Sequence, residues 1–129
     1  MVMKNLLLRQ NLPNGLVLEV YDLSRPMAGD RWQVVLEVRV PIPVTEAVLP
    51  ADLKAKAPEV IEALGPEISF TQQEIHYFID AREVPALLEE MQERLVQGLI
   101  EYLGHPDFAG RYLRKKFAEH QERLRWYPE

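Results

Sequence analysis

The sequence predicts an α+β fold: a four-stranded antiparallel sheet, made of a three-strand meander plus a fourth strand, covered on one face by two long C-terminal helices. Three observations predict it. Seven consecutive even positions from Trp32 to Val44 are apolar, which places one face of a long strand in a core. Turn residues divide the preceding segment into short extended pieces. Beyond residue 84, apolar residues recur every three or four positions, as on the buried face of a helix. We expect residues 1–129 to form a single domain, which suits the chain length.

The first two strands are expected to form a hairpin over residues 6–12 and 16–24. Pro13, Asn14 and Gly15 lie between them. Proline presets φ for an early turn position, while asparagine and glycine tolerate positive φ. The sequence therefore predicts a tight turn at this point.

The third strand is the alternating segment at residues 31–44, which a looser turn over residues 25–30 precedes. Its even side chains are expected to be buried and its odd ones mostly exposed. Pro41 and Pro43 lack backbone donors on the same side of this strand. We therefore expect its end to lie at a sheet edge or to run past its neighbour.

The helical pieces and the fourth strand come next. Residues 45–65 favour one or two short helical pieces, interrupted by Pro58. Residues 68–79 are rich in aromatic and β-branched side chains, which are typical of a strand. We expect a bulge in this strand near Gln72 and Gln73.

Two long helices are expected at residues 84–104 and 106–125. The first carries a broad apolar stripe and ends at Gly104, a natural C-cap. The second carries a narrow seam, typical of a helix that packs against one neighbour. The residues of the seam are Leu113, Phe117, His120, Leu124 and Tyr127.

Composition narrows the class of protein. The chain has no cysteine, so disulfides and thiolate metal sites are excluded, and a reducing compartment fits. The apolar run before Arg9 is only three leucines, too short for a signal peptide core or a membrane span. We therefore expect a cytoplasmic protein that does not bind membranes.

Catalysis is not favoured, and no catalytic residue, metal site or cofactor site is assigned. His76, His105 and His120 are the only histidines, and none belongs to a paired-ligand motif such as H-E-x-x-H. Ser24 and Ser69 are the only serines, and neither has the signature of a nucleophile. A small enzyme with a histidine–carboxylate site is the least favoured alternative. It would bring His76 or His120 close to a carboxylate or an arginine in a cleft.

The last helix is the best candidate for contact with an anion or a partner. Between residues 106 and 126, six basic residues stand against three acidic ones, whereas the whole chain has a net charge of −5. The candidate contacts are Arg111, Arg114, Lys115, Lys116 and Trp126. Nucleic-acid binding is an alternative that is not favoured, because the pI is near 5.3 and acidic residues lie one turn away. His120, in the seam, is the candidate for a pH-sensitive interface.

The segment YDLSRPMAGD resembles, over about eight residues, the D-x-S-x-x-G stretch of PilZ domains, which bind cyclic dinucleotides. Asp22 and Ser24 match, but Gly29 lies too far along the chain. The upstream arginine pair of that family is missing, and the helical half does not fit a small barrel. The chain is therefore not assigned to this family, although Arg25 and Arg31 beside the turn are candidates for contact with an anion.

The leading hypothesis is a non-catalytic binding or assembly module of a cytoplasmic protein system. Its partner would be a second copy of the chain, in a homodimer, or another cytoplasmic protein. Two features favour it: the broad apolar stripe of the first long helix, and the aromatic residues Trp126 and Tyr127 near the end of the chain. A four-stranded sheet does not easily bury both.

Overall fold

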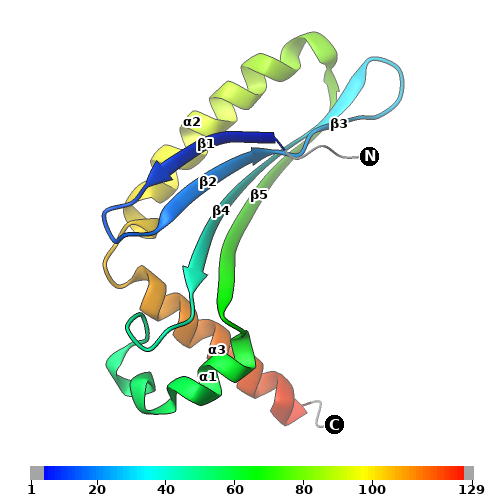
Figure 1. The fold of residues 1–129 in the computed structure, drawn as a ribbon. Helices are drawn as coiled ribbons and strands as arrows, with labels where there is room; N and C mark the ends of the chain where they lie inside the picture. The colour runs from blue at the N-terminus through cyan, green and yellow to red at the C-terminus, as the bar shows by residue number, and fades with distance from the viewer. Residues whose placement is uncertain (1–4, 127–129) are drawn as a thin grey trace. The chain divides into compact units, whose positions relative to one another are not determined.

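The computed structural model describes residues 5–126, and Figure 1 shows its helices and strands. The strands are β1 (Asn5–Asn11), β2 (Val17–Asp22), β3 (Arg25–Pro26), β4 (Arg31–Pro43) and β5 (Glu67–Asp80). Two short 3-10 helices, η1 (Ala51–Lys56) and η2 (Ala81–Glu83), precede α1 (Ala57–Leu64) and α2 (Val84–Leu103), and α3 is Phe108–Trp126. The α+β class, the antiparallel sheet and the two long C-terminal helices are confirmed. None of the described helices is both long and apolar enough to cross a lipid bilayer.

The chain forms two compact units, each made of two separate segments. The first contains the described residues up to Val40 together with Phe70–Gly104, and the second contains Pro41–Ser69 and the described residues from His105 onward. Most of the sheet and α2 thus belong to the first unit, whereas α1 and α3 belong to the second. Both long helices were expected to cover one face of the sheet, and the structure assigns them to different units. That residues 1–129 form one domain stays a prediction.

The strand order makes β4 the central strand of the sheet. β2 and β3 pair with β4 in the same register, with Val20 opposite Val38 and Arg25 opposite Gln33. Both therefore lie on one side of β4, and β5 pairs with its other side. β1 pairs only with β2 among the described strands, so β1 and β5 form the two edges of the sheet (Figure 1). The expected meander is confirmed, and the two-residue β3 lies where only a turn was expected.

The turn between β1 and β2 forms as the sequence predicts. The Leu12 N–H donates to the Leu16 carbonyl at 2.8 Å, and Gly15 has a φ of 88°. The Asn14 carboxamide oxygen accepts from the Leu16 N–H at 3.1 Å, while its nitrogen donates to the Leu103 carbonyl at 2.8 Å. The turn is therefore fastened to the last residue of α2.

The even-numbered residues of β4 form the centre of the apolar core, as the alternation predicts. Trp32, at the start of the strand, stays partly exposed. The fully buried residues of the first unit are Leu18, Val20, Val34, Leu36, Val38, Val40, Met91 and Leu103. In the second unit, Ile42, Val60 and Leu113 are fully buried.

The odd-numbered face of β4 is less exposed than expected. Gln33, Val35 and Glu37 are all buried, so the expectation of a mostly wet face is wrong for these three residues. Their strand has neighbours on both sides, whose side chains cover them. The buried polar groups find partners: Gln33 accepts from Arg25 at 2.6 Å, and Glu37 accepts from Gln73 at 3.1 Å.

The two prolines near the end of β4 behave as predicted. Odd-numbered residues of β4 direct their backbone groups toward β2, as the bond from the Leu23 N–H to the Val35 carbonyl shows. Pairing between β2 and β4 ends at Arg39. Pro41 and Pro43 therefore lie beyond the last residue of β4 that pairs with β2.

A one-residue bulge interrupts β5. Near one end of the strand the Val44 N–H donates to the Pro66 carbonyl, and at the other the Ala81 N–H donates to the Asp30 carbonyl, both at 2.9 Å. Between these bonds β5 contains one residue more than β4, so it must contain a bulge. Phe78, with a φ of 59°, is the only non-glycine residue with positive φ in the described part of the chain and marks its position.

The sequence placed this bulge too early, near Gln72 and Gln73. The hydrogen bond between Gln73 and Glu37 keeps the register that begins at Pro66, so the irregularity comes after it. The register of β5 against β4 is therefore unbroken from Pro66 to Gln73.

Candidate functional site

β5 leaves a large apolar surface exposed. None of its 14 residues is buried, although it lies beside the most deeply buried strand of the sheet. Its largest exposed side chains are Ile75, Tyr77 and Phe78, which are 39%, 57% and 66% exposed. These three exposed side chains lie on a strand at the edge of the sheet, and Figure 1 shows the position of that strand.

The free edge of β5 also presents unpaired backbone groups. Pro66, just before the strand, directs its carbonyl toward β4, so the even-numbered residues before the bulge do the same. Thr71, Gln73, Ile75 and Tyr77 therefore direct their N–H and C=O groups away from β4. No strand within residues 5–126 pairs with that side. This row, which we call the open edge, is a template on which another strand can pair.

The open edge lacks the usual protection against pairing. Natural edge strands are often guarded by lysine, proline or a bulge. β5 contains no lysine and no proline, and its bulge lies near one end. The opposite edge is less suitable, because β1 has only seven residues and a register shift between Leu6 and Leu8.

The α2-facing side of β5 is held by an ion-pair cluster. The Arg94 guanidinium donates to both carboxylate oxygens of Glu74, one of them at 2.9 Å, and to Glu90 at 2.9 Å. His76 Nε2 lies 2.9 Å from Oε2 of the same carboxylate group, an oxygen that Arg94 also contacts. The hydrogen bonds from Arg94, and then from His76, lower the pKa of Glu74 to about 2. The cluster fastens β5 to α2.

This cluster bears on the enzyme alternative, because it does bring a histidine close to a carboxylate and an arginine. With a pKa near 2, Glu74 accepts no proton near neutral pH. His76 is 40% exposed, and the structure shows its ring bonded to Glu74. No three histidine, aspartate or glutamate side chains of the described residues are grouped so as to hold a metal ion. The geometry supports a fastening role better than a reaction.

Replacement of Glu74 by glutamine gives a pH-dependent test of this fastening. Because the pKa is lowered from 4.5 to about 2, the ionised carboxylate contributes stability above pH 4.5, and this contribution is lost as the pH falls toward 2. At pH 7 we expect the variant to be less stable by about 1 kcal/mol, a value that allows for partial exposure. Urea unfolding at pH 7 and pH 2.5 measures the difference, which should nearly vanish at the lower pH. Glu90→Gln is the control, with a change below about 0.5 kcal/mol; equal losses for Glu74→Gln at both pH values would contradict the assignment.

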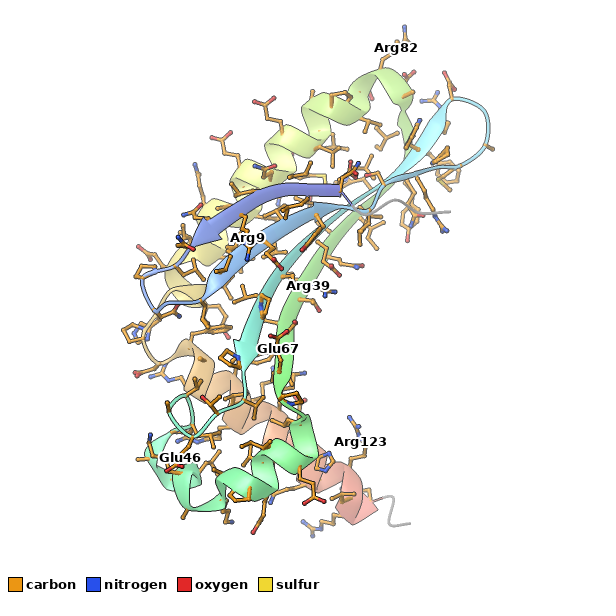
Figure 2. All side chains as sticks on the ribbon, in the orientation of Figure 1. Arg9, Arg39, Glu46, Glu67, Arg82 and Arg123 are labelled. Carbon is orange, nitrogen blue, oxygen red and sulfur yellow. The ribbon has the colours of Figure 1, made fainter. Side chains whose placement is uncertain are left out.

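The face of the sheet opposite α2 is polar. Arg9, Glu19 and Arg39 lie opposite one another on β1, β2 and β4, which gives a row of alternating charge (Figure 2). Arg39 also lies 3.4 Å from Glu37. Burial, followed by the neighbouring Glu19, raises the pKa of Tyr21. Arg39 Nε is buried without a hydrogen-bond partner among the described residues, so this face is only partly paired.

In the second unit, α1 and α3 border a groove of about 400 Å³. His120, the predicted pH-sensitive residue, is partly exposed there. The lining residues are Glu59, Glu62, Ala63, Phe117, His120, Gln121 and Leu124. The seam is buried at Leu113 and Phe117, but Leu124 is exposed, so its predicted burial is wrong at that position. Tyr127 lies outside the described residues.

The predicted basic contacts on α3 have acidic partners in their own unit. Arg111 lies 3.6 Å from Asp107, and Arg114 pairs with Asp52, whose pKa it lowers. These arginines line a shared groove with residues of the segment before η1. Their charges are therefore largely neutralised within the unit.

The other three predicted contacts are more dispersed. Lys116 lies 3.3 Å from Glu119 and 5.4 Å from the centre of the Tyr112 ring. Trp126 is exposed and donates from its indole nitrogen to Glu122 at 3.3 Å. Lys115 is exposed to solvent. These arrangements are typical of an ordinary helix surface.

The arginines beside the turn before β4 are engaged as well. Arg25 donates to Gln33, and Arg31 lies 3.9 Å from Asp80 and 4.0 Å from Asp30. Both arginines therefore already have partners in the chain, which weakens the prediction that they bind an anion.

The sequence pattern predicts β5 as a strand but does not show where β5 lies in the sheet. The open edge was therefore not predicted. Comparisons with models of protein families, with curated proteins and with solved structures find no match to this chain.

Proposed function

We propose that this protein is a non-catalytic assembly module of a cytoplasmic protein system, and that it forms a homodimer. The observation that carries the proposal is the open edge of β5. It combines outward backbone groups with exposed Ile75 and Tyr77, and strand addition would cover both at once.

Other features support assembly over the alternatives. The exposed apolar residues of β5 follow one another, whereas apolar side chains scattered singly are normal on a monomer. Anion or nucleic-acid binding through α3 has weaker support, because Arg111, Arg114 and Lys116 already have acidic partners. A reaction centred on His76 has weaker support because Glu74 is held by Arg94.

The interface of such a dimer is short, and its affinity is accordingly modest. Pairing of one strand from each copy buries less surface than a standard protein–protein interface of about 1,600 Å². We expect a dissociation constant on the order of 10 μM.

Light scattering over a concentration series tests the proposal. From about 1 to about 300 μM, across the expected dissociation constant, the mass should rise from that of the 15.0 kDa chain toward twice that value. The rise should persist at high salt, because apolar contact and backbone hydrogen bonds are screened little. A mass that stays at one chain over the whole series would contradict the homodimer.

A further inference from the structure

Resting on the proposed function, we infer that the second copy adds its own β5 to the open edge, antiparallel to the first and in a register centred on Ile75. The two strands then lie side by side around a two-fold axis perpendicular to the sheet. Three features of β5 favour this register: the direction of its backbone groups, the side chains that would face each other, and the position of the bulge.

The two-fold axis determines which residues can lie at the centre of the pairing. The central residue of such an antiparallel pair lies opposite its own copy. Thr71, Gln73, Ile75 and Tyr77 direct their backbone groups outward, so each could exchange both backbone hydrogen bonds with its copy. Gln72, Glu74 and His76 could instead form the central pair without direct backbone bonds.

The side chains select Ile75 from these possible centres. With Ile75 at the centre, Glu74 lies opposite the partner's His76, and His76 lies opposite the partner's Glu74. These are the positions without direct backbone bonds, where opposing side chains approach most closely. The register therefore places the partner's imidazole beside a Glu74 carboxylate that its own Arg94 and His76 already bind, twice on the α2-facing side.

The other side of the paired strands is also complementary in this register. Ile75, 39% exposed in the single chain, would be covered by its own copy. Gln73 would lie opposite the partner's Tyr77, whose exposed ring it would partly cover. Two exposed apolar side chains of each copy are thus removed from water.

The other centres fit less well. Pairing about Tyr77 sets Glu74 against the partner's Asp80, which is repulsive, and places the bulge inside the ladder. Pairing about Gln73 sets Glu74 against the partner's Gln72 and leaves it without an opposing base. Pairing about Thr71 leaves Tyr77 beyond the strand of the partner. Among the even-numbered centres, Glu74 would set two carboxylates against each other, which is repulsive. His76 would set Glu74 against Phe78 at the bulge, and Gln72 would set Glu74 against Phe70.

The bulge sets the length of the pairing. At Phe78 the backbone leaves the regular strand conformation, so the ladder covers residues 73–77 of each copy. A ladder of only five residues from each chain buries little surface, which agrees with the modest affinity expected for the dimer.

Cysteine cross-linking tests the register, because the natural chain contains no cysteine. In Ile75→Cys the two thiols of a dimer face each other, with Cα atoms about 5.5 Å apart, which suits a disulfide. Leu7→Cys is the matched control: Leu7 lies on β1, at the other edge, and is 40% exposed. Under mild oxidation, the linked dimer of Ile75→Cys should form at least about tenfold faster, because pairing raises the effective thiol concentration.

A mixing experiment checks the same register with a different pair. Gln73→Cys and Tyr77→Cys should each link slowly alone, since neither residue lies opposite itself. Their mixture should yield a linked heterodimer rapidly. Linking of Tyr77→Cys to itself at the rate of Ile75→Cys would overturn the register.

A proline variant separates loss of pairing from loss of fold. The Ile75 N–H faces away from β4, so Ile75→Pro removes no donor within the chain. We expect the variant to stay monomeric at the highest concentration, with a urea unfolding curve that shows a folded protein. If it is unfolded, the cross-linking results decide.

The outcomes distinguish the inference from the proposed function. A dimer by light scattering that does not link through Ile75→Cys, or links equally through Leu7→Cys, overturns this interface and leaves the homodimer standing. If the wild-type chain is monomeric at every concentration and binds only a different protein, both the pairing of two β5 strands and the homodimer are overturned.

Discussion

Replacement of Leu36 by alanine is expected to lower the free energy of unfolding by about 3 kcal/mol. Leu36 is fully buried at the middle of the central strand, between Val34 and Val38, which are also fully buried. Removal of its three outer carbon atoms loses the favourable transfer of apolar surface and leaves a cavity that a packed sheet cannot close. Urea unfolding of wild type and variant measures the loss.

The control for Leu36 is another leucine on a strand. Leu6 on β1 is 50% exposed, so Leu6→Ala should cost less than about 0.5 kcal/mol. If Leu36→Ala cost no more than this, the even-numbered face of β4 would not be the core of the first unit.

Replacement of Gly104 by alanine is expected to lower the free energy of unfolding by about 2 kcal/mol. A Cβ atom at this position would lie 2.9 Å from Pro13 Cδ and 3.0 Å from the Ile100 carbonyl oxygen. Pro13 belongs to the turn that Asn14 fastens to Leu103, so it has little freedom to move away. Thermal and urea unfolding both report the loss.

Gly98 provides the matched control, because it lies in the interior of α2 with nothing within 4 Å of the position of a Cβ. Gly98→Ala should stabilise the protein by about 0.5–1 kcal/mol, since alanine favours a helix over glycine. The same substitution, six residues apart, is thus expected to have opposite signs. Stabilisation by Gly104→Ala would mean that the turn does not pack closely against the end of α2.

The sequence predicts the C-cap at Gly104 but not the reason for the glycine. A C-cap glycine is usually explained by positive φ. Gly104 has a φ of −90°, so any residue could adopt its backbone conformation. The constraint is the approach of Pro13, which lies 91 positions earlier and comes close only when the hairpin packs on α2.

The strands were predictable from local pattern, whereas their burial on both faces was not. The alternation from Trp32 to Val44 identifies β4 and its apolar face. Whether the other face is wet depends on strand order, which places β4 at the centre of the sheet. Gln33 and Glu37 are buried for that reason and find partners on β3 and β5.

The candidate site was still harder to predict. The composition of residues 68–79 indicates a strand, but the open edge exists only because β2 and β3 occupy the same side of β4. On α3, the excess of basic residues favours an anion contact. Arg114, however, pairs with Asp52, 62 positions away, and local pattern does not reveal such a partner.

The left-handed backbone at Phe78 has a consequence for fibril formation. Cross-β stacking draws on six or seven residues that stay extended without interruption. The bulge separates the aromatic end of β5 from the residues before it, so the strand cannot enter such a stack along its whole length. A contact between two copies related by two-fold symmetry occupies the same edge of both, so that edge is not free for a third copy. In the proposed homodimer, growth would therefore stop at a closed pair instead of continuing into a fibril.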